Sequence, residues 1–460
     1  MPRQQANAQL RRALEEAGCS HSRLARTVVD LAASEYGLSL KYDHSSVIRW
    51  LDGQQPRSPG PELVAYVISE RLGRRVSPEE LGMRSGADAI EIGHDLPLTW
   101  NSGIANLTKL WKADMDRRQF LTGSTFAVSV YAAAGVRLLT LPAIEGPLVG
   151  SAGRHIGESE IASLREMART YRQLDNRLGG GQLRAAVVQL LDGQVTPLLR
   201  NASFGEAVGL SLASVAAELA QMVGWMAFDA ESHGLAQRYL VQALGLARLA
   251  GDNSLAAEIL CAMSQQAVYV ARPDQAIDLA RAAGAVARRT GSLVLVTECH
   301  VAEAHGHAAR NDARSCSQAL TAAEHSFAMA VDSHDSPEWL SYFDEAYLSA
   351  RIAQCFRDLG EGNQAVRYAQ KSLDMNGEFV RGRAFNLALL GTGLTQQGDI
   401  DQAAAIGFQA ARVAMSLQSQ RSVRYILNLQ KDLAAIAPPR AIEEFTHQAK
   451  ALARERIARQ

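Results

Sequence analysis

The chain has 460 residues, enough for two or three domains, and its content of 47% hydrophobic and 21% charged residues is typical of globular proteins. A formal net charge of −1 excludes a polybasic nucleic-acid coat and an acidic tail, but it leaves room for one small DNA-binding domain. The five cysteines form no C-x-x-C pair, so we expect neither a zinc ribbon nor a disulfide framework, and reduced thiols favour a cytoplasmic protein. No apolar run reaches the roughly 18–20 uninterrupted residues of a membrane span.

Residues 1–82 have the apolar spacing and the capping residues of a small helical domain. Two helices with apolar side chains at helical spacing precede a third, for which Asp43 is a suitable N-cap and Gly53 a suitable stop. Within this third helix we expect Ile48 to face inward. A further helix is expected over residues 62–72.

The segment SSVIRWLDGQQP resembles the recognition helix of the lambda-repressor-like helix-turn-helix family. That family has a serine-led helix followed by the pattern Trp-x-x-Gly-x-x-Pro, which this chain matches at Ser45, Ser46, Trp50, Gly53 and Pro56. The chain departs from the family where AASEYGLSLKYDH replaces the usual tight turn between the second and third helices. The resemblance implies a DNA-binding domain at this end of the chain.

A recognition helix puts its N-terminal side chains against base edges in the major groove. Arg49 would donate two hydrogen bonds to guanine, the two serines would contact base or phosphate, and Arg57 would contact the DNA backbone. Residues 1–84 hold 12 Lys and Arg against 10 Asp and Glu, a small positive excess for a DNA-binding domain, so a protein-binding helical domain is the alternative. We expect Trp50 in the core, and the predicted DNA-binding set is Lys41, His44, Ser45, Ser46, Arg49 and Arg57.

Residues 83–159 begin as a polar, glycine-rich linker and then include the apolar segment MDRRQFLTGSTFAVSVYAAAG. Read alone, this segment is similar to a twin-arginine export signal, because Arg117-Arg118 precedes an uncharged stretch. Such a signal belongs at the N-terminus of a chain, and here 114 residues precede Met115. We therefore expect a buried apolar helix over 120–136, and the alternative is that Met115 starts an exported form.

From about residue 160 the pattern is helical to the end, and it repeats. In five successive units a small residue is followed twelve residues later by another, and then by residues four and seven positions further on. Small residues at these positions let two antiparallel helices approach closely and stack on the next pair. The second small residues, which we call the anchors, step by 40, 40, 49 and 38 residues along the chain: Ala236, Ala276, Cys316, Ala365 and Ala403.

These units resemble tetratricopeptide repeats, with longer loops than the usual period of about 34 residues allows. The resemblance implies a right-handed α-solenoid over residues 160–460, in which the first helix of each pair lines a concave face. A face that mixes aromatic, amide and Arg side chains suits an extended peptide or a small polar ligand, and an ordinary solvated face is the alternative. Aligning the anchors with the family puts these residues on that face: Gln221, Trp225, Gln265, Tyr269, His305, Tyr347, Arg351, Gln354 and Arg357.

The sequence gives no sign of an enzyme. No nucleophile elbow, Cys-His pair or carboxylate pair has a recognisable catalytic spacing. His300 and His307 lie two turns apart, whereas zinc-binding histidines on a helix are spaced i, i+4, so we expect no metal and no cofactor. The glycines at 179–181 suit a helix stop, and they lack the Lys-Ser/Thr of a phosphate loop.

The whole chain is therefore expected to be all-α. Its combination of domains resembles actinobacterial transcriptional regulators and, more distantly, the peptide-sensing quorum regulators of Gram-positive bacteria. That resemblance implies a cytoplasmic homodimer, regulating development or secondary metabolism, that binds double-stranded DNA and a peptide or small-molecule effector and contacts no membrane. Two alternatives remain: a tetratricopeptide scaffold that binds protein partners without DNA contact, and an exported binding protein that begins at Met115.

Overall fold

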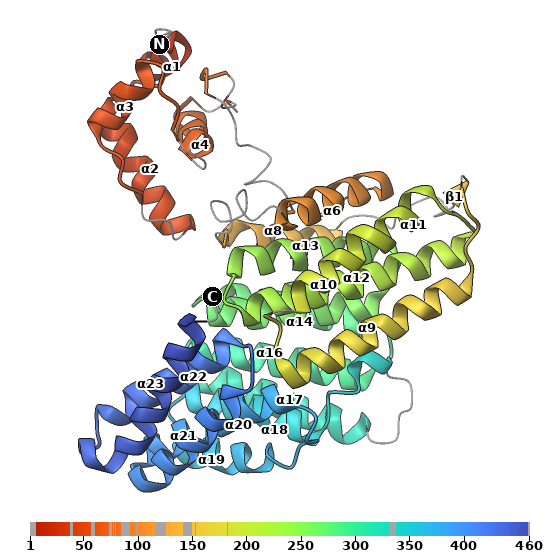
Figure 1. The fold of residues 1–460 in the computed structure, drawn as a ribbon, viewed down its shortest axis with the longest axis vertical. Coiled ribbons are helices and arrows are strands. Elements are labelled where there is room, and N and C mark those ends of the chain that lie inside the picture. The colour runs from red at the N-terminus through yellow and green to blue at the C-terminus, as the bar shows by residue number, and fades with distance from the viewer. Residues whose placement is uncertain are drawn as a thin grey trace.

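The structure is a computed structural model, and it describes residues 6–36, 40–56, 60–72, 76, 78, 80–83, 93–97, 99–115, 126–140, 150–151, 153–181, 183–330 and 337–458. This described part of the chain is all-α, as the sequence predicts (Figure 1). Its strands are only two residues long, and they pair antiparallel: β1 (Gly150–Ser151) and β2 (Ser203–Phe204).

Four helices form an N-terminal bundle with a hydrophobic core of its own: α1 (Ala8–Glu16), α2 (His21–Tyr36), α3 (His44–Leu51) and α4 (Gly60–Leu72). Local capping explains where two of them begin. The side chain of Asn7 accepts a hydrogen bond from the backbone of α1. Asp43 accepts from the backbone N–H of Ser46, whose hydroxyl in turn bonds the N–H of Asp43, so α3 begins with the predicted cap.

The third helix buries one face and exposes the other. Val47 and Trp50 are buried, and the Trp50 ring packs edge-on against Tyr42 with 4.9 Å between ring centroids. The expected position of Trp50 in the core is therefore confirmed. The expectation that Ile48 faces inward is wrong, because Ile48 lies on the other face of this short helix and is 38% exposed.

Two helices between the bundle and the repeats pack on the repeats: α6 (Trp100–Met115) and α8 (Val128–Thr140). Helix α6 was not predicted from the sequence. The predicted apolar helix corresponds in part to α8, which contacts α13 and α15 and buries Tyr131 completely, whereas Val136 on its outer side is 61% exposed. Arg117-Arg118 and the first part of that predicted helix lie outside the described residues.

The rest of the chain begins with three helices and a π-helical turn: α9 (Glu158–Leu178), α10 (Leu183–Leu190), η1 (Leu191–Val195) and α11 (Thr196–Asn201). Six helix pairs follow, with short 3-10 turns before the fourth pair and inside the last (η2, Glu338–Leu340; η3, Pro439–Ile442). The pairs are α12 (Glu206–Asp229) with α13 (His233–Leu249), α14 (Asn253–Tyr269) with α15 (Pro273–Ala287), α16 (Leu293–Ala309) with α17 (Ala313–Ala330), α18 (Glu345–Asp358) with α19 (Gly362–Lys371), α20 (Val380–Gln397) with α21 (Ile400–Met415), and α22 (Gln420–Ala434) with α23 (Glu443–Ala458).

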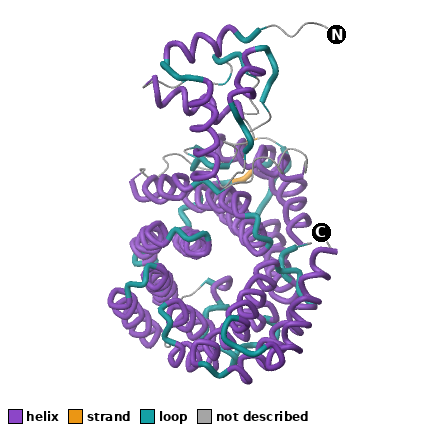
Figure 2. The backbone as a smooth tube through the Cα atoms, turned by 90° about the vertical axis from the view of Figure 1, so that its left-hand side faces the viewer, coloured by secondary structure: helices purple, strands orange, loops and turns teal. Residues whose placement is uncertain are grey.

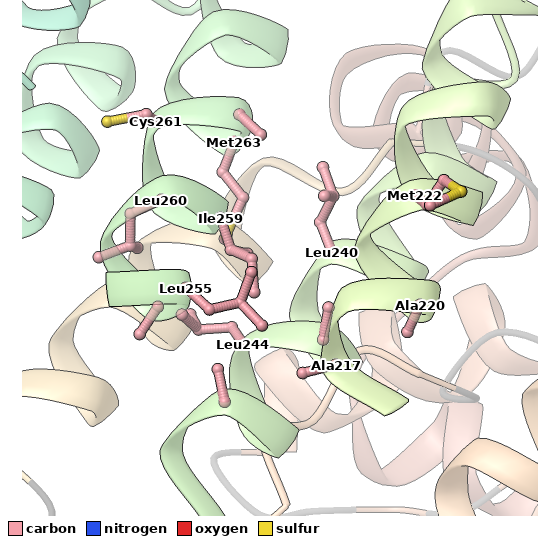
Figure 3. Close-up of a cluster of buried hydrophobic side chains, with 14 of the residues drawn as sticks. Ala217, Ala220, Met222, Leu240, Leu244, Leu255, Ile259, Leu260, Cys261 and Met263 are labelled. Atoms are coloured by element: carbon pink, nitrogen blue, oxygen red, sulfur yellow. The ribbon is translucent and has the colours of Figure 1, made fainter. Parts of the chain in front are cut away.

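The small residues of the sequence repeat lie where the paired helices touch. All five anchors are fully buried on the second helix of their pair. Gly224 on α12 shows why a small side chain is needed, because a Cβ there would lie 2.9 Å from the Leu240 side chain of α13. Figure 3 shows part of the apolar core where α12, α13 and α14 meet, with Leu240, Leu244 and Ile259 among the labelled side chains.

The first helices of successive pairs pack on one another, and the array curves until its two ends meet (Figure 2). Helix α9 contacts α20, and α12 contacts α22. The glycines at 179–181 form the junction: Gly179 has a positive φ of 83° at the end of α9, and Gly181 donates its N–H to the carbonyl of Gln418 over 3.2 Å. A Cβ at Gly180 would lie 2.7 Å from Met226, so only glycine permits this close approach.

Among the helices described, α12 is long and apolar enough to cross a membrane by length and composition. In this fold 61% of its most apolar window is buried against the neighbouring helices. All five cysteines are also buried, and none forms a disulfide.

Candidate functional site

The curved array encloses a cavity of about 230 Å³, which we call the central cavity. Each first helix from α12 to α22 contributes side chains to its wall, and α9 and the segment around η2 complete it. Six of the nine groove residues predicted from the sequence line this cavity: Gln221, Trp225, Gln265, Tyr347, Arg351 and Gln354.

The other predicted ligand-binding residues line a second, more open hollow beside the central cavity. Tyr269, His305 and Arg357 face it together with Gln265, which borders both spaces. The Tyr269 hydroxyl donates to Glu231 over 2.5 Å, and His305 lies 3.1 Å from Asp358. The structure therefore divides the nine predicted groove positions between two adjoining spaces.

Charges in the second hollow neutralise one another. Asp358 lies between His305 and Arg357, with 2.7 Å between its carboxylate and the Arg357 guanidinium. Although burial opposes it, this guanidinium holds the pKa of Asp358 well below its usual range. Burial lowers the pKa of His305, so His305 is neutral near pH 7. Because Asp358 and Arg357 form an ion pair and His305 is neutral, this hollow has little net charge with which to bind a charged ligand.

Where the ends of the array meet, a second charged set borders the central cavity. We call it the closing cluster: Asp175, Asp229, Arg381, Ser419 and Arg421. Arg381 lies 2.7 Å from Asp175 and 3.7 Å from Asp229, and the Ser419 hydroxyl donates to Asp229 over 2.9 Å. The Arg421 guanidinium bonds Asp229 over 3.3 Å and lies over the ring of Phe228, 4.2 Å from its centroid. These charges pair with one another across the junction and hold α9 and α12 against α20 and α22.

Two further carboxyl groups in the central cavity have no such partners. Glu258 accepts a hydrogen bond from Gln221 over 2.6 Å, and Glu298 accepts one from Tyr342 over 2.8 Å. Burial raises the pKa of Glu258 to about 8, and the nearby Glu298 carboxyl adds to that shift. Burial also raises the pKa of Glu298 to about 7, against the opposing effects of Tyr342 and the Arg351 charge. At pH 7 Glu258 is therefore mostly protonated and Glu298 about half protonated.

The sequence analysis missed Glu258 and Glu298, although a signal was present. Glu218, Glu258 and Glu298 recur at intervals of 40 residues, the same step that separates the first three anchors. Equal spacing puts the three carboxyl groups at one position of successive first helices, on the side that faces the centre. Arg172 of α9 pairs with Glu218 over 2.8 Å, which leaves the other two as the distinctive pair.

At the other end of the molecule, the predicted DNA-binding residues gather at the start of α3. Lys41, His44, Ser45 and Arg49 are exposed there. Ser46, which was predicted to contact base or phosphate, is only 3% exposed and so does not lie on the exposed face with them. Its hydroxyl completes the cap with Asp43 and accepts a hydrogen bond from Arg49 over 3.0 Å, so it positions Arg49. Arg57 lies outside the described residues.

Comparison with known proteins gives one family. Residues 10–84 match the SP15 N-terminal domain, a span that begins inside α1 and covers α2, α3 and α4. No curated protein matches the chain. In the described part of the chain, no group of three or more His, Cys, Asp and Glu side chains is arranged to hold a metal ion.

Proposed function

We propose that this protein is a cytoplasmic, dimeric transcriptional regulator, in which the N-terminal bundle binds double-stranded DNA and the curved array binds a peptide or small-molecule effector. The observation that carries the proposal is the division of polar residues. In the bundle, the predicted DNA-contact residues that the structure describes lie mostly exposed at the start of one short helix, whereas the array turns a set of polar and charged side chains inward around a cavity. One part is suited to a large external partner and the other to a small enclosed ligand.

The geometry of α3 supports DNA contact. As in a lambda-repressor-like helix-turn-helix domain, the exposed residues of α3 lie near its N-terminus, and Arg49 projects one turn further on. The bond from Arg49 to the buried Ser46 hydroxyl restricts the Arg49 side chain before DNA arrives. A pre-positioned guanidinium loses less entropy on binding a guanine edge than a free one.

The array supports effector binding in the manner of a tetratricopeptide-like, right-handed α-solenoid. Its paired helices meet through small residues, and its first helices converge on one cavity. The cavity wall combines aromatic rings with amide and charged groups, a mixture that orients a polar ligand while burying its apolar parts. Because Arg381 and Arg421 hold the array closed around this space, an effector that disturbs them would change the curvature of the array.

The test is a gel shift with the full-length protein, on DNA sites selected from random sequence or from genome-wide binding. A regulator retards selected sites at nanomolar to sub-micromolar protein, with affinity that falls steeply as salt rises. Absence of sequence-specific retardation would favour the scaffold alternative, which the modest positive charge of the bundle also suits. N-terminal sequencing of the protein from cells tests the exported form that would begin at Met115.

The effector half of the proposal has its own test. Replacing Arg351 and Gln354 together with Ala should abolish the response of DNA binding to a cell extract that contains the effector, while basal DNA binding stays intact. The Arg351 guanidinium donates a hydrogen bond to the Gln354 side chain over 2.8 Å in the cavity wall. Neither residue belongs to the N-terminal bundle, so basal DNA binding should not depend on them. A double variant that still responds would place the effector elsewhere.

A further inference from the structure

The charges that border the central cavity are unequally satisfied. Arg172, Arg381 and Arg421 each have an acidic partner, at 2.8 Å, 2.7 Å and 3.3 Å respectively. Glu258 and Glu298 are only 8% and 7% exposed, and in the described part of the chain neither carboxyl has an ion-pair partner within 4.0 Å. Arg351 on α18 lines the same cavity and acts on the pKa of Glu298, but it bonds Gln354 and pairs with neither carboxyl. The two buried acidic groups are therefore left with less positive charge than they need.

An independent observation points the same way. One carboxyl oxygen of Glu298, Oε2, is buried and has no hydrogen-bond partner, while Oε1 accepts from Tyr342. A buried acceptor without a donor is costly, so such atoms mark places where a ligand or an ordered water belongs. Glu298 lines the cavity, so a donor that enters it can reach this oxygen.

The surroundings of the two carboxyls favour an organic cation over a metal ion. Trp339, Tyr342 and Tyr347 line the same wall, and the Tyr342 and Tyr347 rings meet edge-on with 5.1 Å between centroids. Aromatic faces attract ammonium groups and their alkyl stems, whereas Mg²⁺ and Ca²⁺ require a shell of about six or more oxygen ligands. A volume of about 230 Å³ also exceeds the space that one ion needs.

We propose that the central cavity binds a ligand with a primary ammonium group, which lies between Glu258 and Glu298 and donates to the free oxygen of Glu298. This inference rests on the proposed function of the array, because it names the chemistry of the effector for the same cavity. Peptides with a lysine side chain or a free N-terminus carry this group, and so do small amines.

Binding of the ammonium group displaces protons. With pKa values of about 8 for Glu258 and about 7 for Glu298, Glu258 is mostly protonated and Glu298 about half protonated at pH 7, and a bound cation favours the ionised forms of both. Affinity therefore falls as the pH falls, by about tenfold between pH 8 and pH 6 for a carboxyl with a pKa near 7. The groups that face the two carboxyls are Arg172 on α9, Glu218 and Gln221 on α12, Cys261 on α14, Tyr342, and Tyr347 and Arg351 on α18.

The experiment is isothermal titration calorimetry on the full-length protein with matched probes. Phenethylamine and the N-acetylated tripeptide Gly-Lys-Gly are compared with phenethyl alcohol and N-acetylated Gly-norleucine-Gly, which have similar shapes but no ammonium group. We expect the amines to bind and to release protons, measured with buffers of different ionisation enthalpy. The neutral probes should bind at least about tenfold more weakly, because each charged hydrogen bond is lost.

Three variants locate the site. Glu298→Gln and Glu258→Gln keep the side-chain volume and resemble the protonated acids, so both should fold, and each should weaken amine binding about tenfold or more. Glu303→Gln is the matched control, because Glu303 lies on the same helix α16 but pairs with Arg281 outside the cavity. It should leave amine affinity unchanged.

Several results would overturn the proposal. They are equal binding of amine and neutral probes, no amine binding at all, full amine affinity in Glu298→Gln, or binding of magnesium chloride that depends on both carboxyls. A gel shift on the same samples keeps the two proposals apart. DNA binding without amine binding would reject the ammonium ligand and leave the regulator function standing. Amine binding without DNA binding would reject the regulator function and leave the ammonium ligand standing.

Discussion

The N-terminal bundle and the curved array use polar residues in opposite ways. The buried polar side chains of the bundle are Asn7 and Ser46, in the part that the structure describes, and both cap helices. The array instead buries whole charged groups, including Asp229, Glu298 and Arg421. A small domain has too little hydrophobic core to offset the desolvation cost of buried charges, so its binding residues lie on its surface. A large array can bury charged groups and place them around an internal cavity.

The largest expected effect is a loss of stability that is confined to the array. Asp229→Ala leaves Arg381 and Arg421 buried without their shared partner and should lower the free energy of unfolding of the array by about 3–5 kcal/mol. Chemical denaturation followed by circular dichroism measures it. Asp278→Ala, at an exposed position on α15, is the control and should change little. DNA affinity should be the same for the folded wild-type protein and for both variants. A loss of less than about 1 kcal/mol in the free energy of unfolding of Asp229→Ala would contradict a structural role for the closing cluster.

The segment between the two parts gives the second test. Phe126 is half-buried against the core of the array and packs edge-on against Tyr131, with 5.4 Å between ring centroids. Phe126→Asp should destabilise the protein by about 1.5–3 kcal/mol, because apolar contact is lost and a charge is placed where it has no partner. Thermal unfolding measures the change.

The export alternative predicts the reverse sensitivity at the same segment. Changing Arg117-Arg118 to Lys-Lys should leave abundance, location and regulation unchanged if the segment is part of the folded protein. A secreted product that begins near Met115, and that disappears with the Lys-Lys change, would show that the segment acts as a signal.

The third test concerns the surface of the bundle. Arg49→Ala should weaken binding to a selected DNA site by about 1–3 kcal/mol, because a bidentate contact to a base edge is removed. Thermal stability should stay unchanged, since Arg49 is exposed. Arg12→Ala, exposed on α1, provides a matched loss of charge away from α3. If Arg49→Ala and Arg12→Ala have equal affinity for the selected DNA site, α3 is not the helix that contacts the bases.

The smallest expected effect is a difference in pH dependence. Glu258 and Glu298 have raised pKa values of about 8 and about 7, so the folded array binds more protons than the unfolded chain above about pH 5. Stability is therefore greatest below about pH 5 and is lost progressively as the pH rises to about pH 8, by on the order of 1 kcal/mol per pH unit for each group that is protonated only in the folded chain. In the bundle, hydrogen bonds from Ser46 lower the pKa of Asp43, which acts in the opposite sense and only below about pH 4.

Hydrogen exchange of peptides from each part, corrected for the intrinsic rate, measures this difference within one molecule. Protection in the array should decline from about pH 5 to pH 8 while protection in the bundle stays level. The double variant Glu258→Gln/Glu298→Gln should abolish the decline. A decline that persists in the double variant would assign the pH dependence to other groups.

Local features of the chain were readable in the sequence because they depend on neighbours within one or two turns. The cap at Asp43, the end of α9 at Gly179 and the buried anchors such as Ala276 follow from side-chain size, hydrogen-bonding capacity and periodicity alone. The all-α class follows for the same reason. Even the spacing of 40 residues between Glu258 and Glu298 was present, although nothing local says that those positions face a cavity.

Only the tertiary structure decided which charges are satisfied. Asp229 and Arg421 are separated by 192 residues, and they meet because the array curves until α12 reaches α22. That curvature is the sum of small rotations between successive helix pairs, set by many side-chain contacts at once, so no short stretch of sequence contains it. The same closure buries Glu298 without a cationic partner, and burial is what changes the pKa of a carboxyl group that would ionise freely in the unfolded chain.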